Sequence, residues 1–258
     1  MGNRTSPFRN ALTTGASSGI GEALAHALAG PDSFLALSGR NADRLSHVAT
    51  NVEERGCALD AQMVDVQDLQ ATAEWIDRTD ARHPLDLVIA NAGISGGTGA
   101  MGGESQDQVR EIFAVNLAGV LNTVLPAVSL MKQRGRGQIA IVSSLAGFRG
   151  MPSAPAYSVS KAAVKVYGEA LRGELHEDGI GVTVVCPGFV KSRITDRNEF
   201  HMPFLMEADD AARIILRGLE RNRARICFPW PMHAAAWLLG ALPPAWTDSL
   251  LRKAPKKT

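Results

Sequence analysis

Apolar runs of strand length alternate with helix-length amphipathic stretches along the whole of this 258-residue chain. Unbroken apolar runs predict strands over residues 8–14, 33–38, 58–64, 85–90, 138–143, 180–185 and 224–228. Apolar spacings of three to four predict helices over residues 19–29, 41–55, 68–79, 104–134, 155–177 and 208–221, and Asn41 can cap the second of them. Such an alternation favours a parallel sheet that helices cover on both faces. We therefore predict a single α/β domain, residues 1–258, with a doubly wound, Rossmann-like sheet in three α/β/α layers.

Composition narrows the classes of function. A formal net charge of +1 argues against a general nucleic-acid binder, which needs a strongly basic face. Cys57, Cys186 and Cys227 are far apart in sequence and have no metal-ligand spacing. We therefore expect no metal and no disulfide framework, which fits a reducing, cytoplasmic compartment. We also expect no signal peptide and no membrane span, because no apolar run reaches the roughly 18 to 20 residues a span requires.

A glycine-rich turn follows the first predicted strand and opens the first predicted helix. It reads Thr14-Gly15-Ala16-Ser17-Ser18-Gly19-Ile20-Gly21. Glycines let the backbone approach a diphosphate closely, and a helix start offers free N–H groups and a positive dipole end. The residues expected to bind cofactor phosphates are Gly15, Ser17, Ser18, Gly19, Ile20 and Gly21. Taken alone, the turn is equally compatible with a tight strand–helix connection.

The second predicted strand ends in Leu37-Ser38-Gly39-Arg40-Asn41, without a carboxylate. An acidic residue here would hold the ribose hydroxyls of NAD, whereas a guanidinium matches the 2′-phosphate of NADP. We therefore predict NADP rather than NAD as the cofactor, with Ser38 and Asn41 assisting Arg40. Alternatively, Arg40 is a solvated residue at a helix start, or it stacks on the adenine of either cofactor.

Two later strand ends extend this predicted site. Asp65 and Val66 follow the third strand, where Asp65 can accept a hydrogen bond from the adenine amino group or serve only as a helix cap. Asn91, Ala92 and Gly93 follow the fourth strand, where small residues let the backbone approach the cofactor. Asn91 can also have a purely structural role in tying neighbouring strand ends together.

The candidate catalytic groups lie on one helix and one strand end. Tyr157 and Lys161 are four residues apart in a predicted helix and therefore share a face. A nearby ammonium can lower the phenol pKa of about 10 by roughly 1 to 3 units, which suits proton exchange with an alcohol or carbonyl oxygen. Ser144 ends the fifth strand, and its hydroxyl can hydrogen-bond that oxygen, with Ser143 as a non-catalytic neighbour. Each feature alone is common, since most Tyr-x-x-x-Lys pairs are surface pairs.

Together, in this order and spacing, these motifs resemble the short-chain dehydrogenase/reductase family over residues 8–228. The resemblance implies that Tyr157 is the acid/base, Lys161 its pKa partner and ribose clamp, and Ser144 the donor to the substrate oxygen. It also implies that Asn116 holds a proton-relay water. The implied activity is NADP-dependent interconversion of a carbonyl and an alcohol. The alternative is a non-catalytic NADP-binding sensor or regulatory subunit on the same fold.

The resemblance extends to the segment after the sixth strand. There it implies that the nicotinamide is oriented by Pro187, Gly188, Val190 and Ser192. Residues 189–206 would form a substrate lid, whose apolar content favours a small apolar substrate, unless the lid packs on the body or on a partner subunit.

The C-terminal part departs from the family pattern. Residues 229–258 form a divergent extension, rich in Trp and Leu, with a basic tail of Arg252, Lys253, Lys256 and Lys257. This end can contact a membrane surface, or it can form a helix that covers the core or a neighbouring subunit. By resemblance, the two long helices over 104–134 and 155–177 would form a homodimer.

Overall fold

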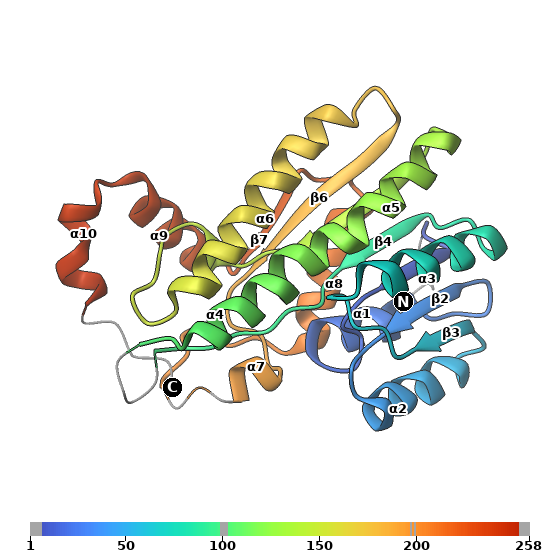
Figure 1. Ribbon diagram of the computed structural model, residues 1–258, viewed down its shortest axis with the longest axis horizontal. Coiled ribbons are helices and arrows are strands. Elements are labelled where there is room, and N and C mark those ends of the chain that lie inside the picture. Colours follow the sequence, from blue (N-terminus) through green and yellow to red (C-terminus); the bar gives the residue numbers. More distant parts are fainter. Residues whose placement is uncertain (1–6, 99–102, 197, 199, 253–258) are drawn as a thin grey trace.

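The computed structural model of the protein describes residues 7–98, 103–196, 198 and 200–252. Its strands are β1 (Asn10–Thr13), β2 (Phe34–Ser38), β3 (Ala58–Gln62), β4 (Leu87–Ala90), β5 (Gly137–Val142), β6 (Ile180–Pro187) and β7 (Arg225–Phe228). They form one parallel sheet in the order β3-β2-β1-β4-β5-β6-β7 (Figure 1). The strand order reverses between β1 and β4, which confirms the predicted doubly wound topology and creates the switch point where such sheets bind ligands.

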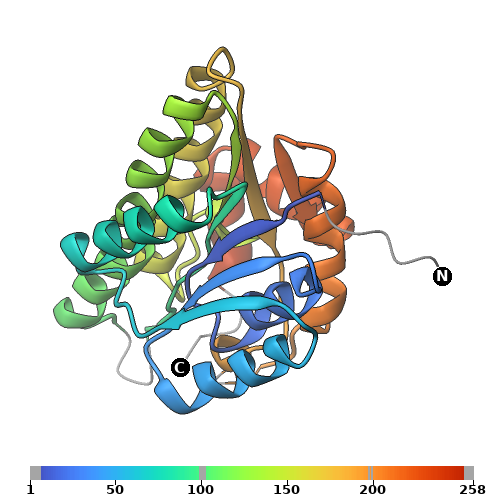
Figure 2. The ribbon, with the colours of Figure 1, turned by 90° about the vertical axis from the view of Figure 1, so that its right-hand side faces the viewer.

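Helices cover both faces of the sheet, as predicted. The helices of the two layers are α1 (Gly19–Leu28), α2 (Ala42–Glu53), α3 (Leu69–Arg82), α5 (Gly119–Arg134), α6 (Pro155–Glu174) and α8 (Ala208–Leu219), and α4 (Gln106–Phe113) leads into α5. α1, α2 and α8 lie on one face and α3, α5 and α6 on the other (Figure 2). Each layer seals its own apolar core, so the sheet is buried on both sides, which explains strands such as β4 that lack polar alternation.

Side-chain caps fix where several helices begin. The Asn41 side chain accepts a hydrogen bond from the Arg44 backbone N–H at 3.0 Å, and the Asp68 side chain accepts one from the Ala71 N–H at 3.0 Å. α5 ends at Gly135, whose φ of +65° suits glycine. The predicted cap at Asn41 is therefore confirmed, and Asp68, not Asp65, caps α3.

The long helix predicted over residues 104–134 is interrupted by a π-helical segment, Ala114–Ala118. By length and composition the helix 106–134 could cross a membrane, contrary to the expectation that no segment could. Half of its most apolar window is buried, and Val120, Val124 and Met131 pack into the core beneath α5. The buried half of its apolar residues therefore serves the interior of the fold.

No bounds were predicted for four elements: a 3₁₀ turn (Leu145–Gly147), α7 (Arg193–Asp196), α9 (Trp230–Ala241) and α10 (Pro244–Leu251). A helix was one of the two alternatives for residues 229–258, and the structure has two helices there. α9 is apolar around its whole circumference and therefore lacks the periodicity on which helix prediction depends. The division of the chain into a domain, a lid at 189–206 and an extension at 229–258 remains a prediction. Residues 197 and 199 of that lid, and the tail residues Lys253, Lys256 and Lys257, lie outside the described residues.

Two cysteines that are distant in sequence are neighbours in the sheet. Cys186 on β6 and Cys227 on β7 are register partners with hydrogen-bonded side chains, and both are free thiols. This hydrogen bond raises the pKa of Cys186 well above its usual value and lowers that of Cys227. Sequence separation alone could not reveal this pairing, because β7 returns to the sheet beside β6.

Candidate active site

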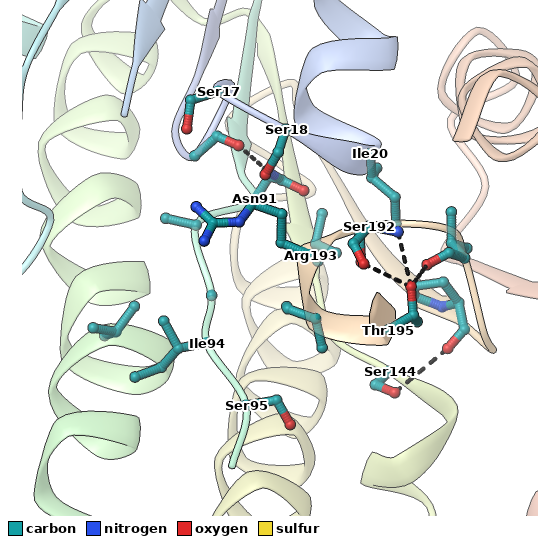
Figure 3. A pocket seen from close by; sticks show the side chains of 18 of the residues that line it. Ser17, Ser18, Ile20, Asn91, Ile94, Ser95, Ser144, Ser192, Arg193 and Thr195 are labelled. Atoms are coloured by element: carbon teal, nitrogen blue, oxygen red, sulfur yellow. Dashed lines mark hydrogen bonds between the residues drawn. The ribbon is translucent and has the colours of Figure 1, made fainter. Parts of the chain in front are cut away.

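A cavity of about 300 Å³ opens where the strands end, around the switch point (Figure 3). The turns after β1, β2, β4, β5 and β6 converge on it, together with α6 and α7. The structure brings to its lining these residues of the predicted site: Gly15, Ser17, Ser18, Ile20, Arg40, Val66, Asn91, Ala92, Gly93, Ser144, Tyr157, Lys161, Pro187, Gly188, Val190 and Ser192. Parts of the chain more than 170 residues apart thus form one site.

The glycine turn lies against the end of β4. Gly15 has a φ of +66°, and a Cβ atom there would come within 2.7 Å of the Ala92 Cα. The Asn91 side-chain amide donates to the Thr14 and Gly15 carbonyl oxygens at 2.9 and 3.0 Å, so the structural role considered for Asn91 is observed. Ser18 precedes α1 without forming a side-chain cap, which leaves the first N–H groups of that helix available to an anion.

Two predicted glycines act from outside the cavity lining. Gly19 has a φ of +59°, and a Cβ atom there would lie 2.7 Å from the Ser192 Cβ. A Cβ atom on Gly21 would lie 2.6 Å from the Asn91 side-chain nitrogen. Both glycines therefore permit the close packing that shapes the phosphate turn, although neither lines the cavity.

Two arginines border the cavity beyond β2. Arg40 lines it as predicted, and its guanidinium lies 3.7 Å from the Glu111 carboxylate. Arg44, which sequence analysis overlooked, lines it as well, and its buried Nε has no hydrogen-bond partner within the described part of the chain. Arg44 lies in the first turn of α2, whereas Arg40 precedes the Asn41 cap, so the available signal was the closeness of Arg44 to Arg40 in sequence. This pair of cations suits a phosphate group.

Three other predicted cofactor residues do not reach the cavity lining. Ser38 is fully buried in β2, and the Asn41 side chain is used as the α2 cap. Asp65 is exposed, and its carboxylate accepts hydrogen bonds from the Gln67 backbone and side chain. Local hydrogen bonds explain Asn41 and Asp65, and a local role was among the predictions for both. The buried Ser38 hydroxyl has no hydrogen-bond partner within the described residues.

Ser144, Tyr157 and Lys161 meet at the end of β5. The Ser144 and Tyr157 side chains are hydrogen-bonded to each other, and the Lys161 Nζ lies 5.9 Å from the centroid of the Tyr157 ring. Lys161 is 3% exposed, and its Nζ donates to the Val142 carbonyl oxygen at 2.9 Å. The predicted shared face of α6 is therefore confirmed, with Ser143 as the expected neighbour, donating to the Lys161 carbonyl.

The electrostatic expectation for this cluster needs correction. Burial raises the pKa of Tyr157, and the hydrogen bond with Ser144 opposes this only in part. Burial also lowers the pKa of Lys161 to about 8. Attraction between an ammonium and a phenolate favours both charged forms, but desolvation, which residue spacing does not reveal, disfavours both of them. The protein thus holds Tyr157 as a neutral phenol, the form that donates a proton.

Asn116 lies in the π-helical segment beside Lys161 and is fully buried. Its side chain accepts from the Ile94 N–H at 2.8 Å and donates to the Ile94 carbonyl and the Ser160 hydroxyl at 2.9 and 3.1 Å. Its amide therefore fixes the segment after β4 against α6. The proton-relay water remains a prediction, and the observed contacts assign the side chain a positioning role.

The lid predicted over 189–206 contributes its first half to the cavity. Arg193, Ile194 and Thr195 line it beside Val190 and Ser192, and Figure 3 shows the Arg193 side chain extending from α7 toward Ser18 and Asn91. On the opposite wall, Ile94 and Ser95 continue from Gly93. These residues directly follow recognised motifs, so extending each motif by two or three positions would have found them.

The second half of the lid does not line the cavity. The Met206 N–H donates to the Phe189 carbonyl at 3.0 Å and the Lys191 N–H to the Met206 carbonyl at 2.9 Å, which pairs Val190 with Met206. This pairing turns the chain outward, so Phe204 and Leu205 are exposed. The apolar residues at 200–206 therefore do not support the hydrophobic pocket that their composition suggested.

Comparison with known proteins agrees with this geometry. A family model described as short chain dehydrogenase matches residues 9–202. An uncharacterized oxidoreductase of Myxococcus xanthus is 39% identical over 95% of this chain and 97% of its own. A short-chain dehydrogenase from Sphingobium yanoikuyae in complex with NADPH superposes with a TM-score of 0.80 at 25% identity, covering 97% and 98% of the two chains. The actinorhodin polyketide ketoreductase with NADPH superposes with a TM-score of 0.78 at 25% identity, covering 90% and 99%.

Proposed function

The chain belongs to the short-chain dehydrogenase family of oxidoreductases, and we propose that it interconverts a small carbonyl compound and its alcohol with NADP as cofactor. The observation that carries this proposal is the meeting of Ser144, Tyr157 and Lys161 in the cavity that the glycine turn borders. The alternative, a sensor without turnover, has no need of a neutral phenol hydrogen-bonded to a serine at that place.

The residues present fit a dinucleotide. Gly15 leaves room for a close approach, the start of α1 has uncapped N–H groups, and Arg44 has an unpartnered buried nitrogen within the described residues. Bound NADPH would supply the hydride. Two related structures hold NADPH, which favours NADP over NAD for this chain as well.

The protein's own groups supply the proton. Tyr157, kept neutral by burial, donates its hydroxyl proton to the carbonyl oxygen, and Ser144 donates a hydrogen bond to the same atom. Lys161 holds a positive charge close to the phenol and stabilises it after proton loss. The apolar side chains of Ile94 and Ile194 line the cavity in which we expect the substrate to bind, so we propose a small apolar substrate.

The activity test is NADPH oxidation by the purified protein with a panel of apolar ketones and aldehydes, and NADP reduction with the matching alcohols. We expect turnover with at least one pair. Tight NADPH binding without turnover across the panel in either direction would contradict the proposed activity and favour the sensor.

Replacement of Arg40 or Arg44 by alanine is expected to weaken NADPH binding by about 10- to 100-fold, because each removes a charge-assisted contact worth roughly 1.5–3 kcal/mol. NADH affinity should change little, since that cofactor lacks the 2′-phosphate. Fluorescence titration with both cofactors measures this, with Arg217→Ala, outside the cavity, as the control. Equal losses for NADPH and NADH would disprove the 2′-phosphate assignment.

Arg193→Gln is expected to weaken NADPH and NADH equally, by about tenfold, because we assign its guanidinium to the diphosphate that both cofactors carry. The same titration separates this residue from Arg40. A loss confined to NADPH would move Arg193 to the 2′-phosphate, and unchanged affinities would remove it from the cofactor site.

We also propose a homodimer through α5 and α6. Leu125, Val159 and Val166 on these helices are more than half exposed, which leaves an apolar surface for a second copy.

A further inference from the structure

Helices α9 and α10, which we call the C-terminal helix pair, carry three of the four tryptophans of this protein, and all three are exposed. Trp230, Trp237 and Trp246 are 77%, 58% and 72% exposed, whereas the fourth tryptophan, Trp75, is 1% exposed. Leu238 and Leu250 are more than half exposed in the same pair, and α9 has no buried residue at all. Burial within the fold therefore does not explain why this segment is apolar.

The helix pair is nevertheless firmly attached to the body, at the end of the molecule shown on the left of Figure 1. The Arg149 guanidinium bonds the Thr247 hydroxyl at 3.2 Å and the Asp248 carboxylate at 3.1 Å. The Phe148 and His233 rings meet edge to face with centroids 5.3 Å apart. These contacts hold one side of the pair against the segment that follows the 3₁₀ turn, so the exposed tryptophans belong to an ordered surface.

Charge indicates what this surface meets. Residues 229–258 contain a single acidic residue, Asp248, and its carboxylate is paired with Arg149. Four basic residues, Arg252, Lys253, Lys256 and Lys257, follow within the same short segment. Exposed tryptophans and leucines, followed in sequence by basic residues and accompanied by one paired acidic side chain, suit a surface of apolar chains and anionic headgroups.

A second copy of the chain is a poorer occupant. In a two-fold symmetric interface the same patch meets itself, so the two basic segments would face each other and repel.

α9 has 12 residues and is about 18 Å long, too short to cross a hydrocarbon layer of about 30 Å. We propose that the C-terminal helix pair docks this enzyme on the surface of a membrane that contains anionic phospholipid, lying in the interface without spanning it.

The test is flotation of the full-length protein with vesicles of phosphatidylcholine alone and of phosphatidylcholine mixed with phosphatidylglycerol. We expect the protein to float with the mixed vesicles and to be released by salt, which screens the basic segment. Trp230→Ser, Trp237→Ser and Trp246→Ser combined should reduce the bound fraction by about tenfold or more. In the unchanged protein, the exposed tryptophans should also shift their fluorescence to the blue when mixed vesicles are added.

A matched control removes exposed apolar side chains elsewhere. Met63→Ser combined with Leu69→Ser should float like the unchanged protein, since both residues lie outside the helix pair. Circular dichroism and NADPH binding check that the triple variant is folded, and neither readout depends on the lipid contact. Docking does not require the proposed activity, so a protein without turnover can still float.

Two outcomes would overturn the proposal. One is recovery of the unchanged protein in the unbound fraction with both vesicle types. The other is equal flotation of the triple variant. If flotation fails and light scattering shows that the triple variant forms a smaller oligomer than the unchanged protein, the surface belongs to a second copy instead.

Discussion

Replacing Tyr157 by phenylalanine is expected to lower the rate of carbonyl reduction by about 10²- to 10⁴-fold, the contribution typical of general acid catalysis. The substitution removes one hydroxyl group and keeps the ring, so the packing of α6 is preserved. NADPH affinity should be retained, because we assign the phosphate contacts to the glycine turn and the arginines that line the cavity. Steady-state rates and a fluorescence titration on the same preparation measure both quantities.

The chain provides its own control for this experiment. It contains two tyrosines, and Tyr167 lies on the same helix, away from the cavity. Tyr167→Phe removes an equivalent hydroxyl and should leave turnover unchanged. A Tyr157→Phe variant as active as the Tyr167→Phe variant would refute the assignment of the proton donor.

Lys161→Met is expected to abolish catalysis and, below pH 8, to relieve the folded protein of a buried charge that destabilises it. Turnover should be lost, because no charge remains to stabilise the ionised phenol. Burial lowers the Lys161 pKa from its usual 10.5 to about 8, which at about 1.4 kcal/mol per pKa unit corresponds to about 3 kcal/mol. Below pH 8 both the folded and the unfolded chain carry this proton, so the folded protein bears the full cost of the buried charge.

The sign of the effect follows from proton binding. Between pH 8 and 10.5 the unfolded lysine keeps its proton and the folded one loses it, so rising pH favours the folded state. The free energy of unfolding of the unchanged protein should therefore rise relative to Lys161→Met across this window, by up to about 3 kcal/mol. Urea unfolding of both proteins at several pH values measures the difference. A constant difference would show that Lys161 keeps its ordinary pKa in the fold.

The sequence was sufficient to predict the doubly wound topology of the sheet and the position of the candidate catalytic residues at the ends of its strands. Apolar strands without alternation require cover on both faces, and parallel strands bring their carboxyl ends to one edge. Ser144, Tyr157 and Lys161 could therefore be placed together before their contacts were known. Arg44 and Arg193 were missed because each lies just beyond a recognised motif, in a segment whose direction depends on the fold.

Other errors came from competition between roles. Asn41 and Asp65 are polar residues at strand ends, but local hydrogen bonds already use their side chains. Desolvation decides the pKa of Tyr157, and burial depth cannot be obtained from residue spacing. The outward turn of residues 200–206 depends on the pairing of Val190 with Met206, a tertiary contact that composition does not encode.

That pairing has a consequence for how the enzyme can diversify. Val190 and Met206 close a loop whose base is fixed to the sheet, while Ile194 and Thr195 within it touch the cavity. Thr195 must be kept, because its hydroxyl accepts from the Ser192 N–H and donates to the Val190 carbonyl oxygen. Exchanges at Ile194 and over residues 200–205 are therefore expected to leave the cofactor site and the proton donor unchanged. A library confined to this loop would sample new substrates on an unchanged catalytic platform, which makes it the natural target for directed evolution.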